Sequence, residues 1–167
     1  MRVLLAFAFL ASFASAAVES LHGPFTINSV VYGENMTLAG SNDEQIKFIG
    51  TTDSYWIIQS VARDAKPWHT IEKYSRITQQ SHYINFKEHK AGEPATISTG
   101  AGSIFEFEYA GFAIFRFASI DHPDLKTKLY WTVKNNGTES QPDLYLALEP
   151  EGVGYQIFTV FNRPVIP

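Results

Sequence analysis

One kind of segment, a short strand-forming run that carries a large aromatic residue, occurs three times at nearly equal intervals. The three runs and their aromatic residues are Ser54–Val61 with Trp56, Ser103–Tyr109 with Phe105, and Tyr155–Phe161 with Phe158. Phe105 follows Trp56 by 49 residues, and Phe158 follows Phe105 by 53. A period of about 50 residues indicates three copies of one supersecondary unit, each ending in an aromatic strand.

Shorter runs rich in branched and aromatic residues fill each unit, separated by turn residues, and no segment has the period of an amphipathic helix. These runs are Phe25–Val31, Asn35–Ala39 and Ile46–Ile49 in the first unit, Trp68–Tyr74, His82–Phe86 and Ala95–Ser98 in the second, and Phe112–Phe117, Leu129–Val133 and Leu144–Leu148 in the third. The pattern predicts an all-β chain, a β-trefoil of twelve strands in three pseudo-repeats of four. An eight-stranded calycin-type barrel or a sandwich is the alternative. In a trefoil, Trp56, Phe105 and Phe158 belong to the core.

Composition favours one domain with a sizeable core. The chain has 167 residues, of which 45% are hydrophobic. The net charge of -4, with only 13 Lys and Arg residues, argues against a nucleic-acid surface. The absence of cysteine excludes disulfide scaffolds and thiolate metal sites.

The first residues have the pattern of a secretory signal. A charged start at Met1-Arg2 precedes the apolar run Val3–Phe13, and Ala14-Ser15-Ala16 supplies small residues for cleavage. The run is shorter than the roughly 20 residues of a membrane-spanning helix, so we expect no membrane partner. Residues 1–16 are therefore predicted to be a signal peptide, and 17–167 a single secreted domain. Two sequons, at Asn35 and Asn136, are candidate glycosylation sites.

No arrangement of residues suggests catalysis. The histidines do not occur at zinc-ligand spacings, and His82 and His89, which flank a predicted strand and its exit, are expected to be solvated. A Gly-x-Ser-x-Gly nucleophile elbow is absent. Glu106 and Glu108 alternate along one strand, which is typical of the polar face of a half-buried strand rather than a catalytic pair. We expect no enzymatic activity, no metal and no cofactor.

The segment from Tyr55–Gln59 through Thr70–Lys73 resembles the join between repeats in fungal β-trefoil protease inhibitors, which are secreted or cytosolic. The resemblance implies a monomeric inhibitor whose partner is a protease. Lectins of the ricin-B type are the alternative and imply a glycan partner, but their Gln-x-Trp motif is incomplete here. The corresponding triplets are Ser54–Trp56, Ser103–Phe105 and Gln156–Phe158, and only the last keeps the glutamine. A secreted effector that binds a host or cell-wall component is a third possibility.

A basic segment follows the first aromatic strand. It runs from Ala62 to Pro67 and contains Arg63, Asp64 and Lys66. In plant Kunitz-type trefoil inhibitors the loop at this place presents a basic residue to trypsin-like enzymes. The resemblance therefore implies that this loop contacts the protease, although a plain solvated loop would have the same composition. Fungal trefoil inhibitors also use other loops, which makes Gly40–Glu44, with Asn42 and Asp43, a secondary candidate.

Overall fold

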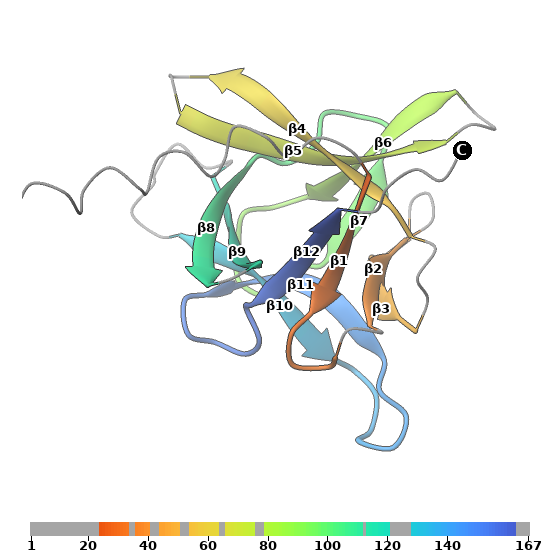
Figure 1. Cartoon of the computed structure of the whole chain (residues 1–167). Helices are drawn as coiled ribbons and strands as arrows, with labels where there is room; N and C mark the ends of the chain where they lie inside the picture. Colours follow the sequence, from red (N-terminus) through yellow and green to blue (C-terminus); the bar gives the residue numbers. More distant parts are fainter. Residues whose placement is uncertain are drawn as a thin grey trace, which may run out of the picture.

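Twelve β-strands make up the protein in a computed structural model, and the described part of the chain contains no helix (Figure 1). The described residues are 24–33, 36–40, 44–50, 54–63, 66–75, 79–111, 113–120 and 128–162, with the side chains of 62–63, 66–67 and 74–75 left out. The strands are β1 (Pro24–Ser29), β2 (Thr37–Ala39), β3 (Lys47–Ile49), β4 (Trp56–Arg63), β5 (Lys66–Ser75), β6 (Gln80–Phe86), β7 (Ala95–Ser98), β8 (Phe105–Gly111), β9 (Ile114–Ser119), β10 (Leu129–Asn135), β11 (Leu144–Pro150) and β12 (Phe158–Asn162). Each of the twelve runs predicted from the sequence overlaps one of these strands, so the all-β prediction is confirmed.

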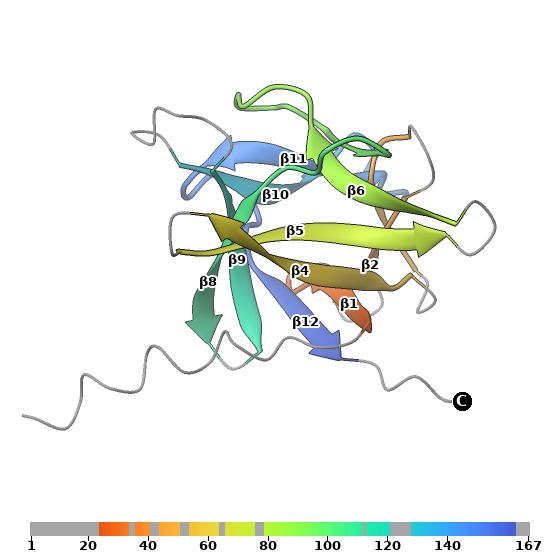
Figure 2. The same cartoon turned by 90° about the horizontal axis from the view of Figure 1, so that it is seen from above.

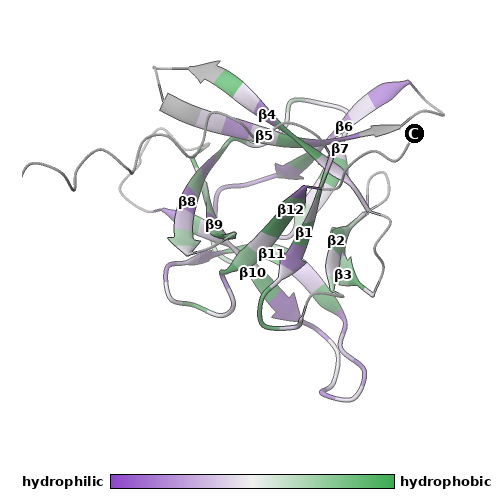
Figure 3. Cartoon of the chain, viewed as in Figure 1, coloured by the Kyte–Doolittle hydropathy of each residue, from purple (hydrophilic) through white to green (hydrophobic). Residues whose placement is uncertain are grey.

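Alternation along the strands explains which residues are buried. In β6, His82, Ile84 and Phe86 are buried, whereas Tyr83 and Asn85 between them are only partly covered. Figure 3 shows the corresponding change between hydrophobic and hydrophilic residues along several strands. The expectation that His82 is solvated is wrong, because its position falls on the inward face of β6 and its exposure is 4%.

Six strands pair in a closed cycle. The antiparallel pairings run from β1 to β4, β5, β8, β9 and β12, and from β12 back to β1. The other six strands form three antiparallel pairs, β2 with β3, β6 with β7, and β10 with β11. Along the chain, each of these pairs is the second and third strand of one predicted unit. Figure 2 shows β4 and β5 lying side by side as the longest strands.

The same register recurs in the three units. Trp56, Phe105 and Phe158 each open the fourth strand of a unit, and each has no exposed surface. Their partners on the first strands are Phe25, His69 and Phe115, in that order. The prediction that the three repeated aromatic residues are core residues is confirmed. His69 occupies a position that is phenylalanine in the other two units, and its buried ring stacks on Phe107 with centroids 4.5 Å apart.

The centre of the core is a cluster of aromatic rings around Trp131 of β10. The Trp131 ring stacks on Phe117, with centroids 4.5 Å apart, and meets Phe105 edge to face at 4.9 Å. Phe158 also meets Trp131 edge to face, at 6.2 Å. Because these rings come from β8, β9, β10 and β12, the core joins the cycle of six strands to the β10–β11 pair.

In each unit a side-chain hydrogen bond connects the second strand to the fourth strand or to the residues just before it. Trp56 Nε1 donates to the Leu38 carbonyl oxygen at 2.9 Å in the first unit. In the second unit Phe86 N donates to Ser103 Oγ at 3.0 Å. In the third, Gln156 Nε2 donates to Thr132 Oγ1 at 3.1 Å. The bond in the first unit comes from the opening residue of the fourth strand, and those in the other two units involve the residue two positions before it.

Candidate functional site

The segment predicted as the protease-binding loop lies at the end of a long hairpin. β4 and β5 are paired over seven successive positions, from Ile57 opposite Glu72 to Arg63 opposite Lys66. The sequence predicted a six-residue loop, Ala62–Pro67. In the structure β4 continues to Arg63 and β5 begins at Lys66, so the segment outside the strands is shorter than predicted. Asp64 lies outside the described residues.

This hairpin extends past the pairings that close the cycle. The described pairing of β5 with β8 is confined to Trp68 and His69, and that of β4 with β1 to Trp56 and Ile57. Lys66 and Pro67 pair with β4 alone among the described strands. Pro67 has no backbone N–H to donate, which is compatible with a strand that lacks a neighbour on one side. Figure 1 shows the paired ends of β4 and β5 reaching beyond the neighbouring strand β8.

The remaining predicted sites are only partly described. Asn42 and Asp43, the secondary candidates, and the sequon residue Asn35 lie outside the described residues. Asn136 is exposed in the connection between β10 and β11, where its backbone N–H donates to the Asp143 carbonyl oxygen at 3.0 Å. Its position allows access to the side chain, and glycosylation there stays a prediction.

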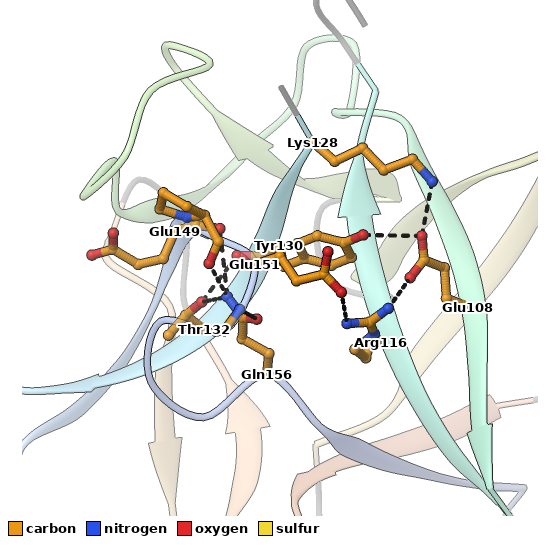
Figure 4. A network of polar contacts seen from close by, with 10 residues as sticks. Glu108, Arg116, Lys128, Tyr130, Thr132, Glu149, Glu151 and Gln156 are labelled. Atoms are coloured by element: carbon orange, nitrogen blue, oxygen red, sulfur yellow. Dashed lines mark hydrogen bonds and ion pairs between the residues drawn. The ribbon is translucent and has the colours of Figure 1, made fainter. Parts of the chain in front are cut away.

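A cluster of ion pairs, which the sequence did not lead us to expect, connects β8, β9 and β10 (Figure 4). The Glu108 carboxylate accepts hydrogen bonds from Arg116 at 2.6 Å, Lys128 at 2.8 Å and Tyr130 at 3.2 Å. Arg116 also donates to Glu151 at 2.6 Å. The Arg116 guanidinium lies 4.7 Å from the centroid of the Tyr130 ring, which adds a cation–π contact.

Electrostatics keep this cluster charged. Burial alone would raise the pKa of Glu108, but the hydrogen bonds and positive charges of Lys128 and Arg116 outweigh burial and lower it. Burial, together with the Glu108 charge, raises the pKa of Tyr130. Glu108 is thus an ionised acceptor with three donors around it. The arrangement is typical of an ion-pair network that stabilises the packing of neighbouring strands, rather than of a catalytic acid–base pair.

Gln156, the one glutamine that matches the lectin motif, is engaged within the protein (Figure 4). Its Nε2 donates to Thr132 Oγ1 at 3.1 Å and to the Pro150 carbonyl oxygen at 2.7 Å, and its Oε1 accepts from Gly152 N at 2.9 Å. The side chain is buried and holds the β11–β12 connection against β10. Gln156 therefore has a structural role that accounts for its presence.

A second polar group missed from the sequence lies on β4, β5 and β6. It consists of Gln59, Glu72 and Tyr83, which are far apart in the sequence and adjacent through strand pairing. The alternation of Gln59 with Ile58, and of Glu72 with Ile71, was the available signal, because it places both polar residues on the face opposite the core. Their contact depends on the register between strands, which alternation does not give.

Within the described ranges, no group of three or more histidine, aspartate and glutamate side chains could hold a metal ion. No helix long and apolar enough to cross a membrane is present in that part of the chain. No protein-family model matches the chain, and no curated protein matches it in sequence.

Proposed function

We propose that the chain is a β-trefoil. The cycle of β1, β4, β5, β8, β9 and β12, with one additional strand pair in each unit, supports this fold. The equivalent placement of Trp56, Phe105 and Phe158 supports a pseudo-threefold arrangement. An experimental structure in which the three units superpose by rotation about one axis is the expected outcome. A two-sheet sandwich would contradict the proposal.

The function we propose is inhibition of a trypsin-like protease by a non-catalytic, secreted, monomeric protein. The observation that carries the proposal is the β4–β5 hairpin, with Arg63 and Lys66 paired at its end. Like charges at directly opposed positions of a hairpin are unfavourable for stability, so folding alone does not account for two cations there. A protease whose specificity pocket contains a carboxylate would compensate such a charge.

The ladder of the hairpin provides the second argument. Seven successive pairs restrict the backbone up to Arg63 on one strand and from Lys66 on the other. An element that is already ordered loses little conformational entropy when it docks, which favours tight binding. Arg63 is the last residue of β4, and Pro67 directly follows Lys66 in β5, so Arg63 is the better candidate to enter the specificity pocket.

The test measures the inhibition constant of the mature protein for trypsin, before and after substitution. Arg63→Ala is expected to weaken inhibition by about 30-fold or more, which corresponds to about 2 kcal/mol at a binding hot spot. The melting temperature should hardly change. Lys66→Ala should have a smaller effect, and Lys87→Ala, a control at an exposed position after β6, none.

Two results would contradict inhibition through this hairpin. One is a wild-type protein that does not inhibit trypsin, and the other is full inhibition by both Arg63→Ala and Lys66→Ala. Glycan binding by Arg63→Ala, together with absence of inhibition by the wild type, would favour the lectin alternative.

Secretion is proposed from the first 16 residues and has its own test. The N-terminus of the protein recovered from culture medium should be Ala17 or a residue within a few positions of it. A secreted protein that still begins with Met1 would contradict the signal peptide.

A further inference from the structure

Gln59, Glu72 and Tyr83 form a polar group on the outer face of three neighbouring strands. In the register of the sheet, Glu72 lies opposite Ile57 on β4 and opposite Tyr83 on β6, and Gln59 lies two residues beyond Ile57 on the same face. The residues that alternate with the group point into the core and are buried, namely Ile58, Ile71 and Ile84. The group is thus on the surface side of a sheet that the core supports from behind.

Glu72 connects the other two members. Gln59 Nε2 donates to Glu72 Oε1 at 2.7 Å, and Tyr83 lies directly opposite Glu72 in the register of β5 and β6. Burial first, and then the proximity of Glu72, raise the pKa of the Tyr83 hydroxyl, so the hydroxyl keeps its proton at neutral pH. Glu72 is only 6% exposed, whereas Gln59 is exposed and Tyr83 partly so.

The two described neighbours of Glu72 in this group, Gln59 and Tyr83, are both neutral. In the part of the chain that the structure describes, no lysine, arginine or histidine forms an ion pair with this carboxylate, in contrast to Glu108. A shielded carboxylate without a cation costs free energy. It also retains acceptor capacity, because two carboxylate oxygens offer about four acceptor positions and the Gln59 amide occupies one of them.

The backbone on one side holds the Tyr83 ring in place. A Cβ atom added to Gly102 would lie 2.7 Å from Tyr83 Cβ and 3.0 Å from its Cδ1, so the glycine backbone is packed against this side chain. The adjacent Ser103 N donates to the Ile84 carbonyl oxygen at 3.1 Å, which ties this segment to β6. The orientation of the tyrosine is therefore set before any ligand arrives.

The chemistry of the group selects the ligand. The Gln59 amide keeps a carbonyl acceptor and a second N–H donor, Glu72 keeps acceptor positions, and Tyr83 adds a hydroxyl oxygen and an aromatic ring. Neighbouring hydroxyl groups of a sugar each donate and accept, and the C–H faces of a sugar ring pack on aromatic rings. An ammonium group only donates, and it would leave the Gln59 N–H without an acceptor.

We propose that this face binds a saccharide, with Gln59 and Tyr83 in contact with the sugar and Glu72 as a positioning residue that orients both. The site is distinct from the end of the hairpin, since Gln59 precedes Arg63 by four residues along β4. It is independent of protease inhibition, and each activity can fail without the other.

The experiment applies the mature wild-type protein to an array of plant, fungal and animal oligosaccharides and then titrates the strongest of them in solution. Gln59→Ala and Tyr83→Ala should each weaken binding by about tenfold or more. Tyr83→Phe keeps the ring and should weaken binding by about two- to tenfold, the range for one lost hydrogen bond. Glu72→Gln should also weaken it, because an amide has one acceptor oxygen in place of two and would hold the Gln59 amide differently. Binding should change little between about 50 and 500 mM NaCl, since no ion pair contributes.

Matched controls are Gln141→Ala and Tyr109→Ala, which remove exposed residues of the same types elsewhere and should leave binding unchanged. Circular dichroism of each variant separates lost binding from lost folding, and Tyr83→Phe remains informative if Tyr83→Ala does not fold. Three results would overturn the proposal: no glycan bound on the array, glycan binding unaffected by Gln59→Ala and Tyr83→Phe, or salt-sensitive binding of a lysine-rich peptide, lost in Glu72→Gln, without glycan binding.

Discussion

Trp56 is the residue whose removal from the core should be most informative, because its contribution separates into packing and one hydrogen bond. The side chain has no exposed surface, and its Nε1 donates to the buried Leu38 carbonyl oxygen at 2.9 Å. Truncation of a buried aromatic residue to alanine costs about 3–5 kcal/mol of unfolding free energy. Leaving a buried carbonyl oxygen without its donor costs about 1–3 kcal/mol more.

Trp56→Ala should therefore lower the unfolding free energy by about 4–8 kcal/mol, a large part of the roughly 5–15 kcal/mol typical of a domain. Phe158→Ala removes an equivalent core residue that has no side-chain N–H donor, so it should cost about 3–5 kcal/mol. Trp56→Phe keeps most of the packing and loses the hydrogen bond, and we expect a loss of about 1–3 kcal/mol. This milder variant keeps the measurement possible if Trp56→Ala does not fold.

The assay is urea unfolding followed by circular dichroism, which does not depend on tryptophan emission. Tyr109→Ala is the control, because Tyr109 is 67% exposed and should cost less than about 1 kcal/mol. A loss below about 1 kcal/mol for Trp56→Ala would refute the packing argument. If Trp56→Phe were as stable as the wild type, the hydrogen bond to Leu38 would contribute nothing.

Two further predictions concern the charged cluster and a tightly packed glycine. The folded-state pKa of Glu108 lies below its ordinary value of 4.5, so its ion pairs stabilise the protein above that pH and are lost as the pH falls through the folded pKa. Between about pH 6 and pH 3, the unfolding free energy of the wild type should therefore fall more steeply than that of Glu108→Gln, and equal slopes would contradict this. Gly102→Ala should cost about 1–3 kcal/mol, because its Cβ would lie 2.7 Å from Tyr83 Cβ. Gly100→Ala, whose nearest neighbour would be Ser98 Oγ at 3.9 Å, is the control, and equal melting temperatures for the two variants would argue against the clash.

The candidate sites were predictable to different degrees. The basic segment around Arg63 was visible as composition, but whether it is a loop or the end of a hairpin depends on the pairing of β4 with β5. Glu108 could be recognised as a polar residue of a strand. Its partners Arg116, Lys128 and Tyr130 lie in or next to other strands, so no local pattern connects them with Glu108.

The group of Gln59, Glu72 and Tyr83 shows the same limit. Alternation within a strand assigns each residue to a face, but two residues on neighbouring strands meet only in one register. Glu72 and Tyr83 are adjacent because β5 and β6 pair in the register that places them opposite each other.

The sequence by itself determined the strands and the identity of the main core residues. Runs of branched and aromatic residues between turn residues are a local property, and they located all twelve strands, while the repeat of about 50 residues pointed to the buried Trp56, Phe105 and Phe158. Only the tertiary structure decided which strands pair, that six of them close a cycle, and that His82 is buried. These features depend on contacts between residues far apart in the chain, and the free energy of such contacts is set by packing in the folded state rather than by any local pattern.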